Sequence, residues 1–293
     1  MTELRQFAAA KINLALHVTG TDARGYHLLD SLVCFADVGD IVTVAPSPSA
    51  EFSITGPMAD ALGAGEDNLV IRAARPLDPL ATARITLEKN LPVASGIGGG
   101  SADAAACLRA LCLLWQRAMP DRDALLSLGA DVPVCIAGQS ARMQGIGAEI
   151  SPLPDLPLLD AVLVNPGAAL STPEVFRALQ KKNNPPLPDL PKGAGWADWM
   201  DFLRATRNDL AAPAAALNAE IGVVLTMLRA TNGCALARMS GSGATCFAIY
   251  ESGAQAQAAA KEIAKRWPDW WVVPARLGGR PISPAPRRNP QDR

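Results

Sequence analysis

The chain has 293 residues, which at about 150 residues per domain predicts two domains. Hydrophobic residues make up 49% and charged residues 19%, a balance that is typical of globular proteins and excludes disordered or collagen-like chains. The formal net charge of -1 argues against nucleic acid or an anionic membrane as a partner, because it provides no broad positive field. The apolar stretches are shorter than the roughly 18 to 20 residues of a membrane-spanning helix, and Glu3 and Lys11 interrupt any secretory signal, so we expect a cytoplasmic protein. The six cysteines form no C-x-x-C pair, and we expect all of them to be reduced core residues.

The first half of the chain is predicted to be rich in strands. Two extended runs, at 4–19 and 28–37, flank a turn and predict a hairpin. Further strands are predicted at 41–45, 51–54, 85–89 and 134–137. Helices are predicted at 68–75, 102–116 and 121–128, with Ser101 or Asp103 as the cap of the second one.

The second half alternates strands and helices. A buried strand at 161–167 ends at a proline and a glycine, and Thr172 followed by Pro173 predicts a helix start. A proline-rich surface loop follows at 185–195. Helices are then predicted at 209–217, 219–231 and 254–267, and strands at 235–240, 245–250 and 271–274. The pattern indicates an α+β protein with an amino-terminal domain at 1–157 and a carboxy-terminal domain at 158–293, whose tail from about 281 is expected to be loose.

A glycine-rich segment between a strand and a helix is the first candidate site. Its glycines let backbone N–H groups approach a phosphate, and the following helix adds partial positive charge. The segment has no lysine after Gly100, which excludes a Walker A loop, and it lies too far along the chain for a dinucleotide fingerprint. The predicted phosphate-binding residues are Pro92, Val93, Ala94, Ser95, Gly96, Ile97, Gly98, Gly99, Gly100, Ser101 and Ala102.

Charged residues in apolar surroundings form the second set of candidates. Lys11 and Asn13 share one face of the first strand, and Lys11 is either functional or a guard of a sheet edge. Asp131 lies in a turn among apolar residues, where it either caps the turn or is functional. Tyr26 and His27 follow a turn and suit a planar ligand, whereas His17 is expected to be a packed or surface histidine.

The order of these motifs resembles that of the GHMP small-molecule kinases. The family shares an early lysine-containing strand, a central glycine-rich loop and a late Gly-Ser-Gly loop, here Ser240, Gly241, Ser242 and Gly243, which alone would also fit an ordinary hairpin. Further stretches are similar to the branch of the family that phosphorylates a cytidine diphosphate sugar alcohol in non-mevalonate isoprenoid biosynthesis. They lie at 10–14, 25–27, 67–69, 91–101, 129–133, 172–176, 208–210 and 240–243.

The resemblance implies a two-domain fold, with a ribosomal-protein-like amino-terminal domain, a ferredoxin-like carboxy-terminal domain and an active site between them. It implies ATP and Mg²⁺ as cofactors, with Ser101 as a candidate metal ligand and Asn68 on the nucleotide side. Asp131 would accept the proton of the acceptor's C2 hydroxyl, and Lys11 would keep that carboxylate ionised. Substrate would be held by Asn13, Tyr26, His27, Thr172 and Phe176.

Two departures and two alternatives remain open at the level of sequence. Prolines at 76 and 79 should stop the preceding helix near Arg75 and alter the adenine pocket, and the loop at 185–199 does not align readily. A homoserine- or mevalonate-type kinase would keep the glycine loop without needing a base clamp of Tyr26, His27 and Phe176. A nucleotide-binding protein without catalytic activity would make Lys11 and Asp131 incidental. The oligomeric state is not indicated.

Overall fold

The computed structural model describes residues 3–75, 77, 82–153, 156–191 and 195–278, so the tail predicted to be loose from about 281 lies outside the described residues. Within those ranges, no helix is both long enough and apolar enough to cross a membrane.

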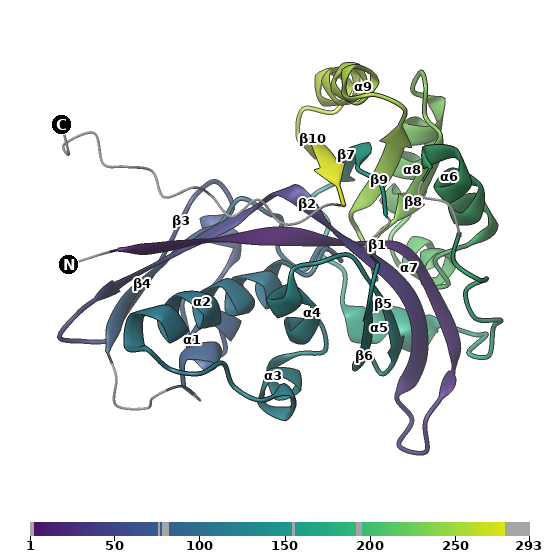
Figure 1. Cartoon of the computed structure of the whole chain (residues 1–293). Coiled ribbons are helices and arrows are strands. Elements are labelled where there is room, and N and C mark those ends of the chain that lie inside the picture. Colours follow the sequence, from purple (N-terminus) through teal and green to yellow (C-terminus); the bar gives the residue numbers. More distant parts are fainter. Residues whose placement is uncertain (1–2, 76, 78–81, 154–155, 192–194, 279–293) are drawn as a thin grey trace.

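A long antiparallel hairpin organises the amino-terminal half (Figure 1). It joins β1 (Leu4–Thr21) to β2 (His27–Pro46), with β-bulges that interrupt its register between Ala9 and Lys11 and between Asn13 and Ala15. One part of β2 also pairs with β4 (Ala83–Glu88), which pairs with β3 (Glu51–Thr55), and another part pairs with β5 (Ala141–Gly145), which pairs with β6 (Glu149–Pro152). A short 3-10 helix at Ala59–Ala61 follows β3.

Four helices cover one side of this hairpin: α1 (Leu69–Ala74), α2 (Gly99–Trp115), α3 (Arg122–Leu128) and α4 (Val132–Ala137). Small side chains on α2, including Ala102, Ala105 and Ala106, are fully buried and allow this helix to lie close to the sheet. The helix before the prolines ends where the sequence predicts, since Arg75 is the C-cap of α1.

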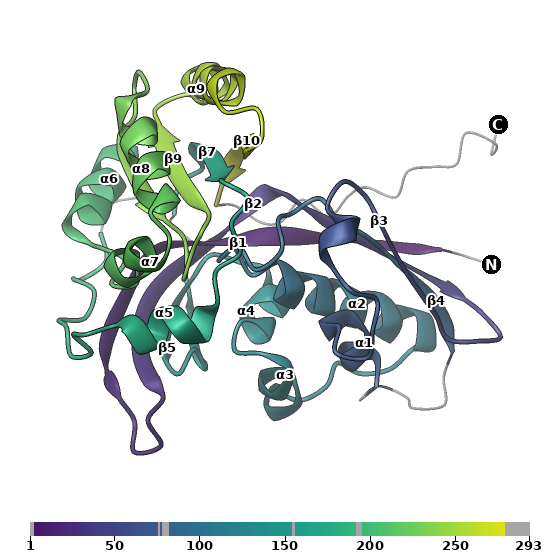
Figure 2. The ribbon, with the colours of Figure 1, turned by 180° about the vertical axis from the view of Figure 1, so that it is seen from behind.

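The carboxy-terminal strands lie on the other side of the hairpin (Figure 2). The central strand β7 (Leu159–Asn165) pairs with β10 (Trp271–Leu277) and with β9 (Cys246–Tyr250), and β9 pairs with β8 (Leu236–Met239). A single pairing of Leu277 with Ala36 joins this group to β2. The helices of this half are α5 (Thr172–Ala178), α6 (Trp196–Ala205), α7 (Ala211–Leu217), α8 (Glu220–Ala230) and α9 (Gly253–Arg266). The strand groups change between Pro152 and Leu159, and the domain boundary at 157/158 stays a prediction.

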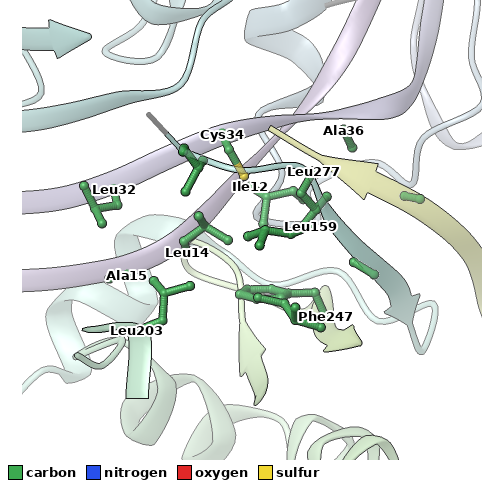
Figure 3. Close-up of a cluster of buried hydrophobic side chains, with 14 of the residues drawn as sticks. Ile12, Leu14, Ala15, Leu32, Cys34, Ala36, Leu159, Leu203, Phe247 and Leu277 are labelled. Carbon is green, nitrogen blue, oxygen red and sulfur yellow. The ribbon is translucent and has the colours of Figure 1, made fainter. Parts of the chain in front are cut away.

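The alternation of side chains along β1 separates the core from the polar candidates. Ile12 and Leu14 pack with Phe247 and Leu277 in a buried cluster that joins the hairpin to the carboxy-terminal strands (Figure 3). Lys11 and Asn13 point to the opposite face of the strand, as a period of two requires. Burying each of these large apolar side chains contributes about 1.5 to 3 kcal/mol, so the packing that joins the two halves also fixes the strand that carries Lys11.

Two predictions of secondary structure and one helix cap are wrong. Residues 134–137 form the end of α4 and not a strand, because Pro133 suits the first turn of a helix that begins at Val132, and Val134 and Cys135 are buried in the cluster that contains residues of α2. The helix predicted from residue 102 begins at Gly99, and its N-cap is Gly98 in a left-handed conformation, so neither Ser101 nor Asp103 caps it.

Several elements were not predicted from the sequence. The strands β5 and β6 are short, and β5 has only two buried positions, so their alternation is weak. The helix α6 begins at Trp196, directly after the proline-rich loop. Of the six cysteines, Cys112 and Cys234 are only partly buried, which corrects the expectation that all are core residues; all six are free thiols.

Candidate functional site

A cavity of about 660 Å³ contains most of the residues that the sequence singles out. The glycine-rich segment from Pro92 to Ser101 forms one wall, except for Ile97, which is buried, and Asn68 lies beside it. Thr172 and Phe176 of α5 also line the cavity, as do Lys11, Asn13 and Asp131. The fold therefore assembles one site from segments that are more than 160 residues apart in the chain.

Lys11 and Asp131 form an ion pair in this cavity. Lys11 Nζ lies 2.8 Å from Asp131 Oδ2, and the lysine is only 4% exposed. Its aliphatic stem packs against Gly98, where a Cβ would lie 3.2 Å from Lys11 Cβ and Cε. A buried lysine in this setting does not guard an exposed sheet edge. Asp131 is the N-cap residue of α4, but its side chain makes no capping hydrogen bond, so the carboxylate is directed to Lys11 instead.

Asn13 lines the cavity and holds a buried acceptor that no group of the described residues uses. Its Nδ2 donates to Ser31 Oγ at 2.8 Å, and that hydroxyl donates to the Ala15 carbonyl at 2.7 Å. This chain of hydrogen bonds orients the amide, and Asn13 Oδ1 is buried without a hydrogen-bond partner among the described residues. A buried acceptor of this kind costs free energy unless a ligand donates to it.

The two glycine-rich loops touch each other, which the sequence does not show. Ser240 Oγ donates to the Gly96 carbonyl at 3.0 Å and accepts from the Asn13 backbone N–H at 3.0 Å. Gly96 has a φ of +76°, and a Cβ there would lie 2.6 Å from both Gly243 N and the Ser240 carbonyl oxygen. The turn between β8 and β9 therefore supports the glycine-rich segment in addition to forming a hairpin.

The start of α2 is open to an anion. Its N-cap is Gly98, which has no side chain to accept from the first-turn N–H groups, and Gly98, Gly99, Gly100 and Ser101 all line the cavity. Unpaired N–H groups at the start of a helix of 17 residues, together with the helix dipole, favour a phosphate at this position.

A buried group of three charged side chains lies beneath the same loop. Lys89 Nζ donates to Asp40 Oδ2 at 2.5 Å and to Asp103 Oδ2 at 2.7 Å, and none of the three residues is more than 2% exposed. Burial raises the pKa of the Asp103 carboxyl. Burial lowers the pKa of Lys89, but the charges of Asp103 and Asp40 outweigh this effect and the net shift is upward.

The predicted base clamp is only partly assembled. The rings of His27 and Phe176 lie 4.9 Å apart at an angle of 34°, and Phe176 lines the cavity. Burial, with a smaller contribution from Lys182, lowers the pKa of His27, whose Nε2 is buried without a hydrogen-bond partner in the described part of the chain. Tyr26 is 61% exposed, lies with its ring 5.2 Å from the Arg24 guanidinium and does not line the cavity.

Thr172 and Asn68 both line the cavity and both make hydrogen bonds within the protein. The Thr172 and Ser242 hydroxyls are 2.7 Å apart, so the late Gly-Ser-Gly loop also contacts α5. Asn68 caps α1 by accepting from the Val70 N–H at 2.9 Å, and its Nδ2 donates to the Gly63 carbonyl. The capping role of Asn68 is structural, and its contact with nucleotide stays a prediction.

Comparison with known proteins identifies the family. Models of the GHMP kinases match the chain in two parts, the N-terminal domain at residues 68–143 and the C-terminal domain at residues 189–269. A 4-diphosphocytidyl-2-C-methyl-D-erythritol kinase from Cereibacter sphaeroides (strain ATCC 17025 / ATH 2.4.3) is 54% identical over 281 residues, which cover 95% of this chain and all of the relative. The chain belongs to the GHMP kinase family. It is an ATP-dependent phosphotransferase that acts on an alcohol group, and its α+β fold is the two-domain fold of that family.

Other relatives of this GHMP kinase agree. A Paracoccus denitrificans protein with the same name is 56% identical over 274 residues, covering 93% of this chain and 96% of the relative. A solved 4-(cytidine 5′-diphospho)-2C-methyl-D-erythritol kinase shares 32% identity with a TM-score of 0.78, covering 94% of this chain and all of that chain. A homoserine kinase from Cytophaga hutchinsonii, at 19% identity and a TM-score of 0.64, covers 96% of this chain and 95% of its own and shares the fold.

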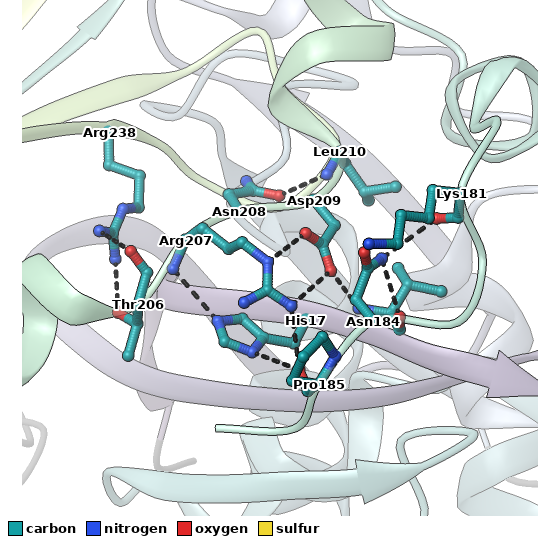
Figure 4. Close-up of polar contacts among 11 residues, drawn as sticks. His17, Lys181, Asn184, Pro185, Thr206, Arg207, Asn208, Asp209, Leu210 and Arg238 are labelled. Carbon is teal, nitrogen blue, oxygen red and sulfur yellow. Dashed lines mark hydrogen bonds and ion pairs between the residues drawn. The ribbon is translucent and has the colours of Figure 1, made fainter. Parts of the chain in front are cut away.

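Sequence reasoning missed that Asn208 holds the loop from Ser240 to Gly243 of this kinase in place. Figure 4 shows the Asn208 side chain and its bond to Leu210. Asn208 Nδ2 donates to the carbonyls of Met239 and Gly241, each at 2.8 Å, and Asn208 Oδ1 accepts from the Leu210 N–H. The only signal in the sequence is the family stretch at 208–210, which does not reveal what the asparagine contacts.

His17 is a packed histidine, as predicted. It is 1% exposed, and its Nε2 accepts from the Arg207 backbone N–H at 3.1 Å, so the proton is on Nδ1, which donates to the Pro185 carbonyl at 3.0 Å. Burial, followed by the charge of Arg207, lowers the pKa of His17. His17 therefore anchors the proline-rich loop, at Pro185, to β1 and is not a site residue.

Proposed function

We propose that this kinase transfers the γ-phosphoryl group of ATP to the C2 hydroxyl of 4-diphosphocytidyl-2-C-methyl-D-erythritol, giving the 2-phosphate and ADP in non-mevalonate isoprenoid biosynthesis. The observation that carries the chemistry is the Lys11–Asp131 ion pair, which lines the same cavity as the start of α2 and lies beside its N-cap, Gly98. Full-length relatives at about half identity carry the name of this acceptor.

The nucleotide side would neutralise charge. Phosphoryl transfer has a loose transition state, so the site must mainly align the reactants and stabilise charge on the transferred group. Backbone N–H groups from Gly98 to Ser101 and the dipole of α2 supply fixed positive potential for the ATP phosphates.

The residues at hand also fit Mg²⁺. Among the described residues no three or more His, Cys, Asp or Glu side chains gather as a metal cage, and Mg²⁺ in kinases is typically held by few protein ligands together with substrate phosphates and water. Ser101 lines the cavity, and its hydroxyl lies close to Gly129, in the turn that carries Asp131: a Cβ added to Gly129 would be 3.6 Å from Ser101 Oγ. The Ser101 hydroxyl would contribute to holding the ion. Bound Mg²⁺ would neutralise charge on the phosphates.

The acceptor side would remove a proton. Asp131 accepts the proton of the C2 hydroxyl while the hydroxyl oxygen forms a bond to the γ-phosphorus of ATP. The bond from that phosphorus to the bridging oxygen, which leaves with ADP, breaks at the same time. Asn13 Oδ1, which lacks a partner among the described residues, accepts a hydrogen bond from an acceptor hydroxyl. Lys11 holds the Asp131 carboxylate in position and offsets negative charge near the transferred group.

The cytosine would lie against Phe176, with His27 behind it. Phe176 lines the cavity, and His27, whose ring lies 4.9 Å from that of Phe176 but does not line the cavity, has a buried Nε2 without a partner among the described residues that would bond to the base. Tyr26, at the tip of the hairpin, would close over the base from outside. A homoserine- or mevalonate-type acceptor has no heteroaromatic ring that needs these groups. Both substrates are small molecules, and a cytoplasmic location stays a prediction.

The test is ADP release by purified protein that is given Mg-ATP and one of three acceptors: the cytidylyl alcohol, mevalonate or homoserine. We expect turnover with the cytidylyl alcohol alone. Turnover with another acceptor would retain the kinase chemistry and refute the base clamp. Binding of ATP without ADP release from any of the three would favour a nucleotide-binding protein without catalysis.

A further inference from the structure

The phosphate loop is held at both ends by one buried ammonium group. The loop leaves β4 at Lys89 and runs to the first turns of α2, which contain Asp103. Lys89 Nζ bonds to Asp103, and it also bonds to Asp40, whose Oδ1 accepts from the backbone N–H groups of Asn90 at 2.6 Å and Leu91 at 2.8 Å. The beginning and the end of the loop are thus tied to the same three side chains.

The backbone around Lys89 is fixed as well. The Lys89 N–H donates to the Thr55 carbonyl at 2.7 Å, and the Lys89 carbonyl accepts from the Met58 N–H at 3.0 Å. A Cβ on Gly99 would lie only 3.2 Å from Lys89 Nζ, so the ammonium lies directly against the first residue of α2. This leaves little room for a bulkier cation, and the position of α2 depends on where the ammonium lies.

The group also reaches the cavity. Lys89 and Asp103 both line it, and Asp103 Oδ1 is buried without a hydrogen-bond partner among the described residues. Two carboxylates around one ammonium are costly to bury, and such a group contributes less to stability than to holding one arrangement of the backbone. A role in function is therefore a better explanation than a contribution to folding alone.

We propose that Lys89, Asp40 and Asp103 are positioning residues for ATP, which set the spacing between the two ends of the phosphate loop and so aim its N–H groups at the phosphates. They act through the loop and do not touch the reacting atoms. This inference rests on the proposed assignment of residues 92–102 to the ATP phosphates.

Two substitutions at position 103 distinguish the effect of losing the hydrogen-bond acceptor from the effect of changing the side chain as such. Asp103→Asn keeps an oxygen that accepts from Lys89, and its amide NH₂ takes the place of the unpartnered Oδ1. Asp103→Leu keeps the branched arrangement of four side-chain heavy atoms but removes the acceptor, and it leaves Lys89 and Asp40 as a neutral pair, so the buried charge is balanced and folding is retained. Loss of a charge-assisted hydrogen bond corresponds to a weakening of about tenfold or more.

Asp30→Asn is a matched control. Asp30 lies on the same strand as Asp40, is equally buried, and likewise bonds to a cation, Arg142, and to a backbone N–H, that of Leu187. It differs in lying away from the phosphate loop. We expect this variant to melt at a lower temperature and to bind ATP normally.

The experiment measures the dissociation constant of a non-hydrolysable ATP analogue with Mg²⁺ by calorimetry, the binding of CDP, and the KM of ATP. Asp103→Leu should weaken binding of the analogue about tenfold and raise the KM of ATP while CDP binding is unchanged, and Asp103→Asn should stay within about threefold of the wild type. Wild-type affinity in the leucine variant, or an equal weakening in Asp30→Asn, would overturn the proposal. Failure of the wild type to bind the analogue would overturn the assignment of the phosphate loop itself. Binding of the analogue by a wild type that releases no ADP from ATP and the cytidylyl alcohol would contradict the proposed function and leave this inference standing.

Discussion

The nucleotide side and the acceptor side of the cavity are built in different ways. The proposed nucleotide side is one continuous segment, from Pro92 to Ser101, held by buried charges below and by the β8–β9 turn beside it. The acceptor side brings together Asn13 from β1, Asp131 before α4 and Phe176 from α5. A continuous loop depends on local backbone geometry, and an assembled surface depends on how distant elements pack. Substitutions on the two sides should therefore fail in different ways.

The largest effect is expected from Asp131→Asn on the acceptor side. The carboxamide keeps the shape of the side chain but cannot accept the hydroxyl proton, so kcat should fall by about 10² to 10⁴-fold. The KM values of both substrates should change little, because the packing around the site is retained. Steady-state kinetics with each substrate varied in turn would check this, and a variant with near-wild-type kcat would exclude Asp131 as the base.

On the nucleotide side, Gly96→Ala should damage backbone geometry. Its new Cβ would meet Gly243 N at 2.6 Å at a φ of +76°, so both strain and a steric conflict with the β8–β9 turn are expected. We expect a loss of about 3 kcal/mol in the free energy of unfolding and a higher KM for ATP.

Gly167→Ala is the control for this substitution. Gly167 has a similar φ of +84°, but nothing lies within 4 Å of its Cβ position, so only conformational strain of about 1 kcal/mol is expected. Denaturant unfolding of both variants gives the comparison. Equal losses would show that contact between the two glycine loops contributes nothing.

A smaller and more selective effect is expected from Phe176→Ala. Removing the aromatic face should raise the KM of the cytidylyl substrate by about tenfold, the usual loss for one stacked base, and leave the KM of ATP unchanged. Tyr26→Ala should have a weaker effect, because Tyr26 is exposed and lies outside the cavity lining. If the tyrosine variant were the more damaged one, the hairpin tip and not α5 would provide the main contact with the base.

The smallest effect concerns His17, which lies outside both sides of the site. Its pKa in the folded chain is lowered from 6.5, so the unfolded chain takes up the proton first as the pH falls. The free energy of unfolding should therefore decrease below about pH 6.5, by no more than about 1.4 kcal/mol per pH unit, and level off below the folded-state pKa. Urea unfolding between pH 7.5 and 5 should show a shallower decrease in His17→Gln; identical profiles would mean that His17 does not titrate in this way. The chain has one other histidine, and the comparison of the two proteins cancels its contribution.

The sequence predicts features that lie in one continuous segment better than contacts between segments that are distant in the chain. The order of the motifs gave the family, and the glycines of the 92–101 segment predict a phosphate-binding loop that lines the cavity, because both signals lie in contiguous residues. Three sets of hydrogen bonds join segments that no local sequence pattern relates. They link Ser240 to Gly96, Asn208 to Gly241, and Lys89 to Asp103. The error at 134–137 has the same origin: β-branched residues favour a strand, but Pro133 and packing near α2 decide for a helix.

The central claim is transfer of phosphate to the C2 hydroxyl through the Lys11–Asp131 pair, and ³¹P NMR of the product tests it most directly. C2 of the acceptor carries a methyl group and no hydrogen, so the account predicts one new phosphomonoester singlet, stoichiometric with ADP, while the acceptor's diphosphate signals persist. A new ester signal split by a neighbouring carbinol hydrogen, or ADP formed without any ester, would contradict it.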